Sequence, residues 1–90
     1  MRIVKNSIAG TLESSDIHVE VSPGTGVEID VQSTVLTQFG DSIKKTVMDV
    51  LREMEVGDVR VFANDRGALD CVIRARLETA LLRAAGGDGP

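Results

Sequence analysis

The chain has 90 residues and a formal net charge of -4, with two phenylalanines and neither tryptophan nor tyrosine. A chain of this length forms one domain with one core, so a second domain or a deep substrate cavity is not expected. An acidic chain with few aromatic side chains is also a poor candidate for nucleic-acid binding, which uses basic surfaces and stacking platforms. No apolar run approaches membrane-spanning length, and the N-terminus lacks the apolar stretch of a signal peptide, so we expect a cytoplasmic protein.

The first third of the chain has the pattern of short strands separated by turns. Residues 8–12 are compatible with a strand, and the acidic and hydroxyl residues 13–16 favour a turn after it. Residues 17–21 and 27–31 alternate apolar and polar side chains, which is typical of half-buried strands. Because the glycine-rich residues 22–26 form a turn between these two strands, we expect the two to pair as a hairpin.

A helical period replaces the alternation in the middle of the chain. Apolar residues recur every three or four positions from Val35 to Met54, which predicts one long amphipathic helix with Ser33 or Thr34 as its N-cap. Gly40 lies inside this expected helix and costs about 1 kcal/mol relative to alanine, so the prediction allows a bend there.

The last third of the chain predicts one more strand and one more helix. Residues 58–63 alternate again, and residues 64–67 then form a turn in which Asp65 is a suitable N-cap. The apolar period from Leu69 to Ala84 predicts the second helix.

The order of these elements predicts the fold class. Each strand has one apolar face and each helix one apolar stripe, so two packed layers bury all of them. We therefore expect an α+β two-layer sandwich, in which two helices cover one face of a mostly antiparallel sheet of three to four strands. The step through the long helix to the last strand fits a right-handed crossover. The domain occupies residues 1–85, and the glycine-rich residues 86–90 form a disordered tail.

Three features resemble chemical sites but have simpler structural interpretations. His18, the single histidine, is expected beside Glu20 on the exposed sheet face, and a metal site needs several convergent ligands. Cys71, the single cysteine, is expected to pack in the core as a small apolar residue. Residues 24–26 join two strands rather than a strand and a helix, so they are expected to form a turn and not a phosphate-binding loop. No catalytic residue and no metal site are expected.

Serines at two places are candidates for covalent modification. Asp41-Ser42-Ile43 resembles the Asp-Ser-Leu of helical acyl carrier proteins, whose serine bears phosphopantetheine, but it falls within the predicted long helix. We expect Ser42 to be an ordinary solvent-facing residue. Ser14 and Ser15 lie in the first turn without a neighbouring base, and such a turn is most often only a turn. A serine without a base is a poor nucleophile, yet it can accept a group from an enzyme that supplies the activation.

Three blocks of sequence add a more specific signal. The blocks are Ala9-Gly10-Thr11-Leu12-Glu13-Ser14 followed by Asp16, then Gln38-Phe39-Gly40-Asp41, and then Arg66-Gly67-Ala68-Leu69-Asp70-Cys71 followed by Ile73-Arg74-Ala75-Arg76-Leu77-Glu78. Together they resemble the citrate lyase acyl carrier protein (gamma chain) family, over residues 2–84 and in the right order.

The resemblance implies a carrier that performs no chemistry with its own side chains. Members of the family carry 2'-(5''-phosphoribosyl)-3'-dephospho-CoA, attached covalently through a phosphodiester to a serine that matches Ser14 here. The thiol of this arm carries acetyl and citryl thioesters during cleavage of citrate to acetate and oxaloacetate. Members often have glycine where this chain has Ser15, so Ser15 is the alternative attachment residue.

The resemblance also implies partners. An alpha subunit (acyl transferase) exchanges acetyl for citrate, and a beta subunit (citryl lyase) releases oxaloacetate and restores the acetyl group. A transferase attaches the arm, and a ligase acetylates its thiol. Glu13 and Asp16, which flank Ser14 and Ser15, are expected to help the transferase recognise the site. Neither nucleic acid nor a membrane is an expected partner.

Two other interpretations stay open. The carrier subunit of malonate decarboxylase resembles this family and bears the same kind of arm. A plain α+β interaction module without an attached group is the other alternative. A stand-alone enzyme would need a cluster of His, Cys, Lys or carboxylate side chains in a pocket, and the sequence offers no such cluster.

Overall fold

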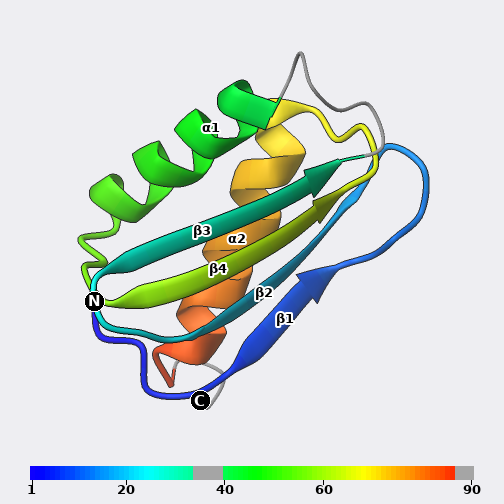
Figure 1. Cartoon of the computed structure of the whole chain (residues 1–90). Coiled ribbons are helices and arrows are strands. Elements are labelled where there is room, and N and C mark those ends of the chain that lie inside the picture. Colours follow the sequence, from blue (N-terminus) through cyan, green and yellow to red (C-terminus); the bar gives the residue numbers. More distant parts are fainter. Residues whose placement is uncertain (34–39, 87–90) are drawn as a thin grey trace.

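The computed structural model describes residues 1–33 and 40–86, which form a four-stranded sheet with two helices packed on one face (Figure 1). The elements are β1 (Ser7–Gly10), β2 (Ile17–Pro23), β3 (Val27–Ser33), α1 (Gly40–Glu53), β4 (Val59–Asp65) and α2 (Asp70–Ala84). This arrangement confirms the predicted α+β two-layer sandwich. None of the described helices has the length and apolar character needed to cross a bilayer.

The strand order is β1-β2-β4-β3, so the predicted hairpin of β2 and β3 is wrong. β4 lies between these two strands, antiparallel to β2 and parallel to β3, and Pro23 and Val27 both align with Val59. Alternation of side chains shows which face of a strand is buried, but it does not show which strand lies beside it. The parallel pair of β3 and β4 requires a crossover, and α1 provides it.

The core lies between the sheet and the two helices. β2 and β4 bury the side chains that the sequence predicted, and each helix buries one stripe. In β3, by contrast, Ile29 and Val31 are only partly buried and Val27 is exposed. The fully or nearly fully buried apolar residues of β2, β4, α1 and α2 are Ile17, Val19, Val21, Val59, Val61, Ala63, Ile43, Val47, Val50, Leu51, Ile73, Leu77, Ala80, Leu81 and Ala84. The loops at the ends of the sheet connect elements that share this core. The core therefore fixes both ends of each loop.

The predicted start of the first helix falls on residues that the structure does not describe. α1 begins at Gly40, and Thr34 and Val35 lie outside the described residues. Ser33 is not a helix cap, because it ends β3 and pairs opposite Asp65. Its hydroxyl donates a hydrogen bond of 2.9 Å to the Asp65 carboxylate. The hydroxyl therefore joins two strand ends instead of a helix end.

Asp65 is not the N-cap of α2 either. Its side chain is 1% exposed and accepts hydrogen bonds from the backbone N–H groups of Gly67 at 3.1 Å and Ala68 at 3.0 Å. These bonds stabilise the turn between β4 and α2. The N-cap residue is Leu69, which makes no side-chain capping bond. Asp65 thus accepts backbone hydrogen bonds as an N-cap residue would, but from the turn and not from the helix.

Cys71 is exposed, which corrects the prediction that it packs in the core. The buried stripe of α2 includes Ile73 and Leu77. A residue two positions before Ile73 lies about 200° around the helix and faces away from the sheet.

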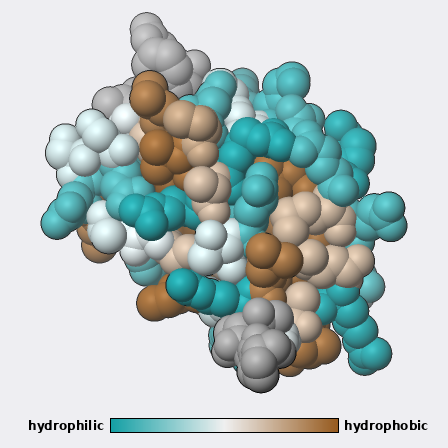
Figure 2. Space-filling model, turned by 180° about the vertical axis from the view of Figure 1, so that it is seen from behind, coloured by the Kyte–Doolittle hydropathy of each residue, from teal (hydrophilic) through white to brown (hydrophobic). Residues whose placement is uncertain are grey.

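Figure 2 shows the molecule from behind, where hydrophobic and hydrophilic residues alternate over the surface. Leu69 and Leu82 are 70% and 50% exposed. Of the predicted tail, residues 87–90 lie outside the described residues.

Candidate functional site

Residues 11–16 form the loop between β1 and β2, at the end of the sheet where β4 also ends (Figure 1). The two strands are antiparallel, with Gly10 opposite His18, so the predicted turn is confirmed. Ser14 and Ser15 are both exposed, as expected. Within the described part of the chain, no hydrogen bond occupies the Ser14 hydroxyl. The hydroxyl is therefore accessible to a modifying enzyme.

The loop is held in one shape by bonds among its own residues. The Thr11 hydroxyl donates to the Asp16 carboxylate at 2.6 Å, and its oxygen accepts from the Glu13 N–H at 3.2 Å. The Asp16 N–H donates to the Glu13 carbonyl at 3.1 Å. Three bonds among six residues restrict the backbone on both sides of Ser14.

Two backbone bonds tie the loop to the turn after β4. The Ser15 N–H donates to the Arg66 carbonyl at 2.8 Å, and the Arg66 N–H donates to the Asp16 carbonyl at 2.9 Å. They continue the β2–β4 ladder one pair beyond the end of both strands. Ser14 therefore lies next to a stretch of backbone whose position is fixed by β2 and β4.

Asp16 connects the loop to α2. Arg76 donates from Nε to Oδ1 at 3.1 Å and from Nη2 to Oδ2 at 2.9 Å, and the Ile17 N–H donates to Oδ1 at 2.7 Å. These Arg76 bonds, followed by the Thr11 hydroxyl, hold the pKa of Asp16 far below its ordinary value. Because both carboxylate oxygens are engaged inside the molecule, Asp16 anchors the loop. Of the two carboxylates that flank the serines, Glu13 is the exposed one.

Replacing Asp16 with asparagine is expected to destabilise the fold at neutral pH. Since the folded-state pKa of Asp16 is lowered, its contribution is present above the ordinary value of 3.8 and is lost as pH falls below it. Thermal unfolding of both proteins should show a lower Tm for Asp16→Asn at pH 7. The difference should shrink as the pH decreases below about 4. An equal difference at pH 7 and in strong acid would contradict this role of the carboxylate.

Ser15 adopts a left-handed backbone conformation, with φ of 66°. A residue with a Cβ pays about 1–2 kcal/mol there, and glycine does not. Glycine would fit the same backbone without this cost. Ser15→Gly should therefore stabilise the protein by about 0.5–1 kcal/mol after the greater freedom of glycine in the unfolded chain is subtracted. Urea unfolding measures this change, and a loss of stability would show that the loop has another conformation.

The other predicted candidates lie apart from this loop. Ser42 is exposed, as predicted, but it is in the first turn of α1 and not in the middle of a helix. His18 is partly exposed on β2. Residues 1–33 and 40–86 contain no group of three or more His, Cys, Asp or Glu side chains that could hold a metal. Residues 24–26 form a bend, as expected.

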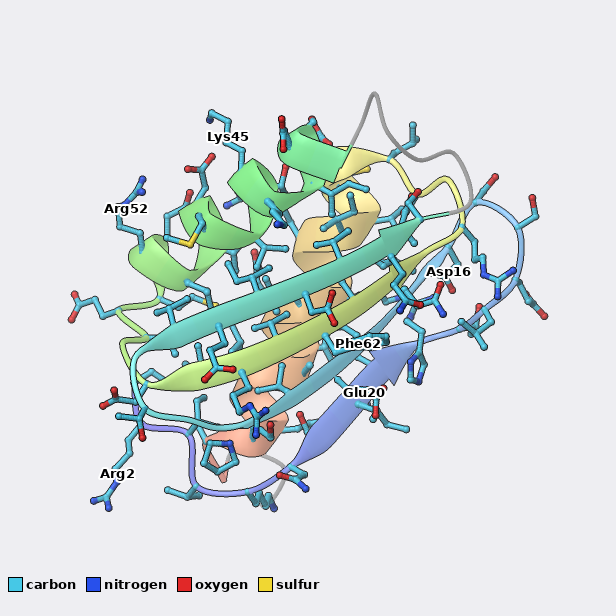
Figure 3. The ribbon with its side chains drawn as sticks, viewed as in Figure 1. Arg2, Asp16, Glu20, Lys45, Arg52 and Phe62 are labelled. Atoms are coloured by element: carbon cyan, nitrogen blue, oxygen red, sulfur yellow. The ribbon has the colours of Figure 1, made fainter. Side chains whose placement is uncertain are left out.

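The uncovered face of the sheet has a depression of about 430 Å³, whose lining includes Glu20 and Phe62 (Figure 3). All four strands contribute to the lining, and neither His18 nor Cys71 is part of it. The polar part of its lining consists of hydroxyl, amide, carboxylate and arginine side chains, among them Ser7, Ser22 and Glu20.

Three residues that shape the loop were not singled out from the sequence. Arg76 lies in the apolar stripe of α2, and a charged residue in such a stripe indicates a specific partner, here Asp16. Gly10 directly precedes a turn, which is a signal for a positive φ, and its φ is 87°. The role of Arg66 depends on the loop reaching the end of β4, which no local pattern shows.

Comparison with known proteins defines the class. Residues 4–84 match the family model described as acyl carrier protein, malonate decarboxylase delta subunit. The fold is similar to that of a chain in the crystal structure of a Pseudomonas malonate decarboxylase hetero-tetramer in complex with malonate, with a TM-score of 0.73 and 18% identity over 93% of this chain and 92% of that one. This chain therefore belongs to the class of small acyl carrier proteins that this model describes, and it shares the fold of the malonate decarboxylase chain.

Curated relatives narrow the class to one family. The chain is 53% identical over 85 residues to the citrate lyase acyl carrier protein of Cronobacter sakazakii, covering 93% of this chain and 88% of the relative. It is 50% identical over 84 residues to that of Treponema denticola, covering 93% and 97%. The chain belongs to the citrate lyase acyl carrier protein family.

Proposed function

We propose that this chain is the acyl carrier subunit of a citrate lyase and that it bears a phosphoribosyl-dephospho-CoA arm on Ser14. The observation that supports this most is the exposed hydroxyl of Ser14, which lies in a loop fixed by Asp16, Arg76 and Arg66. Related citrate lyase carriers share the sequence at about 50% identity. When bound, the arm supplies a thiol that carries acyl groups as thioesters.

The residues beside Ser14 suit the phosphodiester of this arm. The Nε of Arg66 is buried without a hydrogen-bond partner among the described residues. Arg66 belongs to the turn whose backbone bonds to Ser15 and Asp16 of the loop, so this cationic residue lies next in space to the proposed attachment site. Ser14 is the preferred attachment residue. Ser15 is the alternative, but its N–H is tied to Arg66 and its backbone is strained.

The proposed function divides the work between the carrier and its partner enzymes. A tethered acyl group has a high effective concentration at any active site that the carrier reaches, so the carrier itself needs no base or metal. We infer that an alpha acyl transferase and a beta citryl lyase provide those sites, with a transferase and a ligase that load the arm. All of them would act in the cytoplasm.

Reconstitution tests this function. The arm-bearing chain, mixed with the alpha and beta subunits of a citrate lyase, should produce oxaloacetate from citrate, and the arm-free chain should not. The same two preparations mixed with the partner subunits of a malonate decarboxylase provide the comparison. Activity with the second set alone would favour the malonate decarboxylase carrier, which the family model and the structural neighbour also suggest. An unmodified mass after co-expression with the transferase would favour a plain interaction module.

A further inference from the structure

We propose that Arg66 binds the phosphate that joins the arm to Ser14, so that the turn after β4 is part of the attachment site. This inference rests on the proposed function, because it requires a phosphodiester on Ser14. It assigns a ligand-binding role to a residue of the chain outside the loop.

The first observation is an unsatisfied donor. The Arg66 Nε is buried, and no described residue accepts its hydrogen bond. Buried N–H groups nearly always have partners, so an exception at a functional loop requires an explanation. An anion attached after folding would provide the missing acceptor. The residue as a whole is partly exposed.

The second observation is position. The Arg66 carbonyl accepts from Ser15 at 2.8 Å and its N–H donates to Asp16 at 2.9 Å. Ser14 precedes Ser15, and consecutive Cα atoms are about 3.8 Å apart. A phosphate on the Ser14 hydroxyl would thus lie within the length of one arginine side chain from the Arg66 backbone.

The third observation is charge. Arg76 is already paired with Asp16, whereas Arg66 forms no ion pair with any described carboxylate. A phosphodiester on Ser14 would add a negative charge beside Glu13, and Arg66 is the cation placed to balance it. The planar guanidinium offers two parallel N–H donors, the geometry that phosphate oxygens accept best.

Nuclear magnetic resonance of the ¹⁵N-labelled chain tests the contact before and after the transferase attaches the arm. The Arg66 Nε–H signal, assigned by its absence in Arg66→Met, should move downfield on attachment. Its exchange with water should slow by about tenfold or more, as expected for a charge-assisted hydrogen bond. No change in either quantity on a chain fully modified at Ser14 would overturn the inference.

Thermal unfolding provides a second readout. Attachment should raise the Tm of the unsubstituted chain and of Arg60→Met, a control in which the exposed partner of Glu28 is removed. The Tm of Arg66→Met should not rise on attachment. Equal increases in both variants would contradict a role for Arg66. Peptide mass analysis of the same samples separates the two claims: an adduct away from Ser14 rejects the proposed function, whereas an adduct on Ser14 with an unchanged Arg66 signal rejects the phosphate contact alone.

Discussion

Replacing Ser14 with alanine is expected to prevent attachment of the arm and to reduce citrate cleavage by the reconstituted complex to the level of the arm-free chain. The reason is that the hydroxyl oxygen is the atom that would form the phosphodiester, and alanine offers none. The effect on stability should be small, because Ser14 is exposed and its hydroxyl bonds to no described residue. Intact mass and oxaloacetate production measure the two losses on one preparation.

Two matched variants serve as controls. Ser15→Gly removes the alternative hydroxyl while suiting the left-handed backbone, and Ser42→Ala removes the exposed hydroxyl at the start of α1. Both should accept the arm and support citrate cleavage at a rate close to that of the unsubstituted chain. Loss of the adduct in Ser15→Gly, with full modification of Ser14→Ala, would move the site by one residue. Loss of the adduct in Ser42→Ala would place the attachment site in α1.

Gly10→Ala is expected to have the largest effect on stability. A Cβ at this position would lie 1.8 Å from the Ile17 carbonyl oxygen, and the φ of 87° is unfavourable for any residue with a side chain. The backbone would have to move where β1 enters the loop. Left-handed strain and overlap with the backbone together cost about 3 kcal/mol or more. The Tm should decrease by roughly 10–25 °C for a domain of this size.

Gly26→Ala separates the two causes. Gly26 also has a positive φ, of 74°, but no heavy atom lies within 4 Å of a Cβ built there. Its substitution should cost only the backbone strain, about 1 kcal/mol. If urea unfolding gives similar losses for Gly10→Ala and Gly26→Ala, close packing of Ile17 against Gly10 is not what requires glycine at the loop entrance.

The elements of the fold could be predicted because each leaves a local signal. Alternation identified the inward faces of β2 and β4, and the apolar period of α2 identified Ile73 and Leu77 as core residues. Pairing could not be predicted in the same way, because insertion of β4 between β2 and β3 is decided by contacts among distant segments. The same limit explains Asp65, whose carboxylate binds the turn and Ser33 rather than a helix end.

The candidate site shows a similar division. Turn-forming residues located the loop and the exposure of Ser14, and the resemblance to a carrier family selected that serine. The sequence does not show which bonds hold the loop, because Arg76 is sixty positions from its partner Asp16 along the chain. Cys71 was misjudged because neighbouring apolar residues were counted instead of its angular position on α2. The composition around a helical residue therefore predicts its burial less well than its angular position on the helix does.

Peptide mass spectrometry of the chain co-expressed with the transferase tests the central claim most directly. The account predicts one phosphoribosyl-dephospho-CoA adduct, on the peptide that contains Ser14, with fragment ions that place it on that residue. An adduct on the Ser42 peptide, or a chain that stays unmodified beside a transferase shown to load a related carrier, would contradict it.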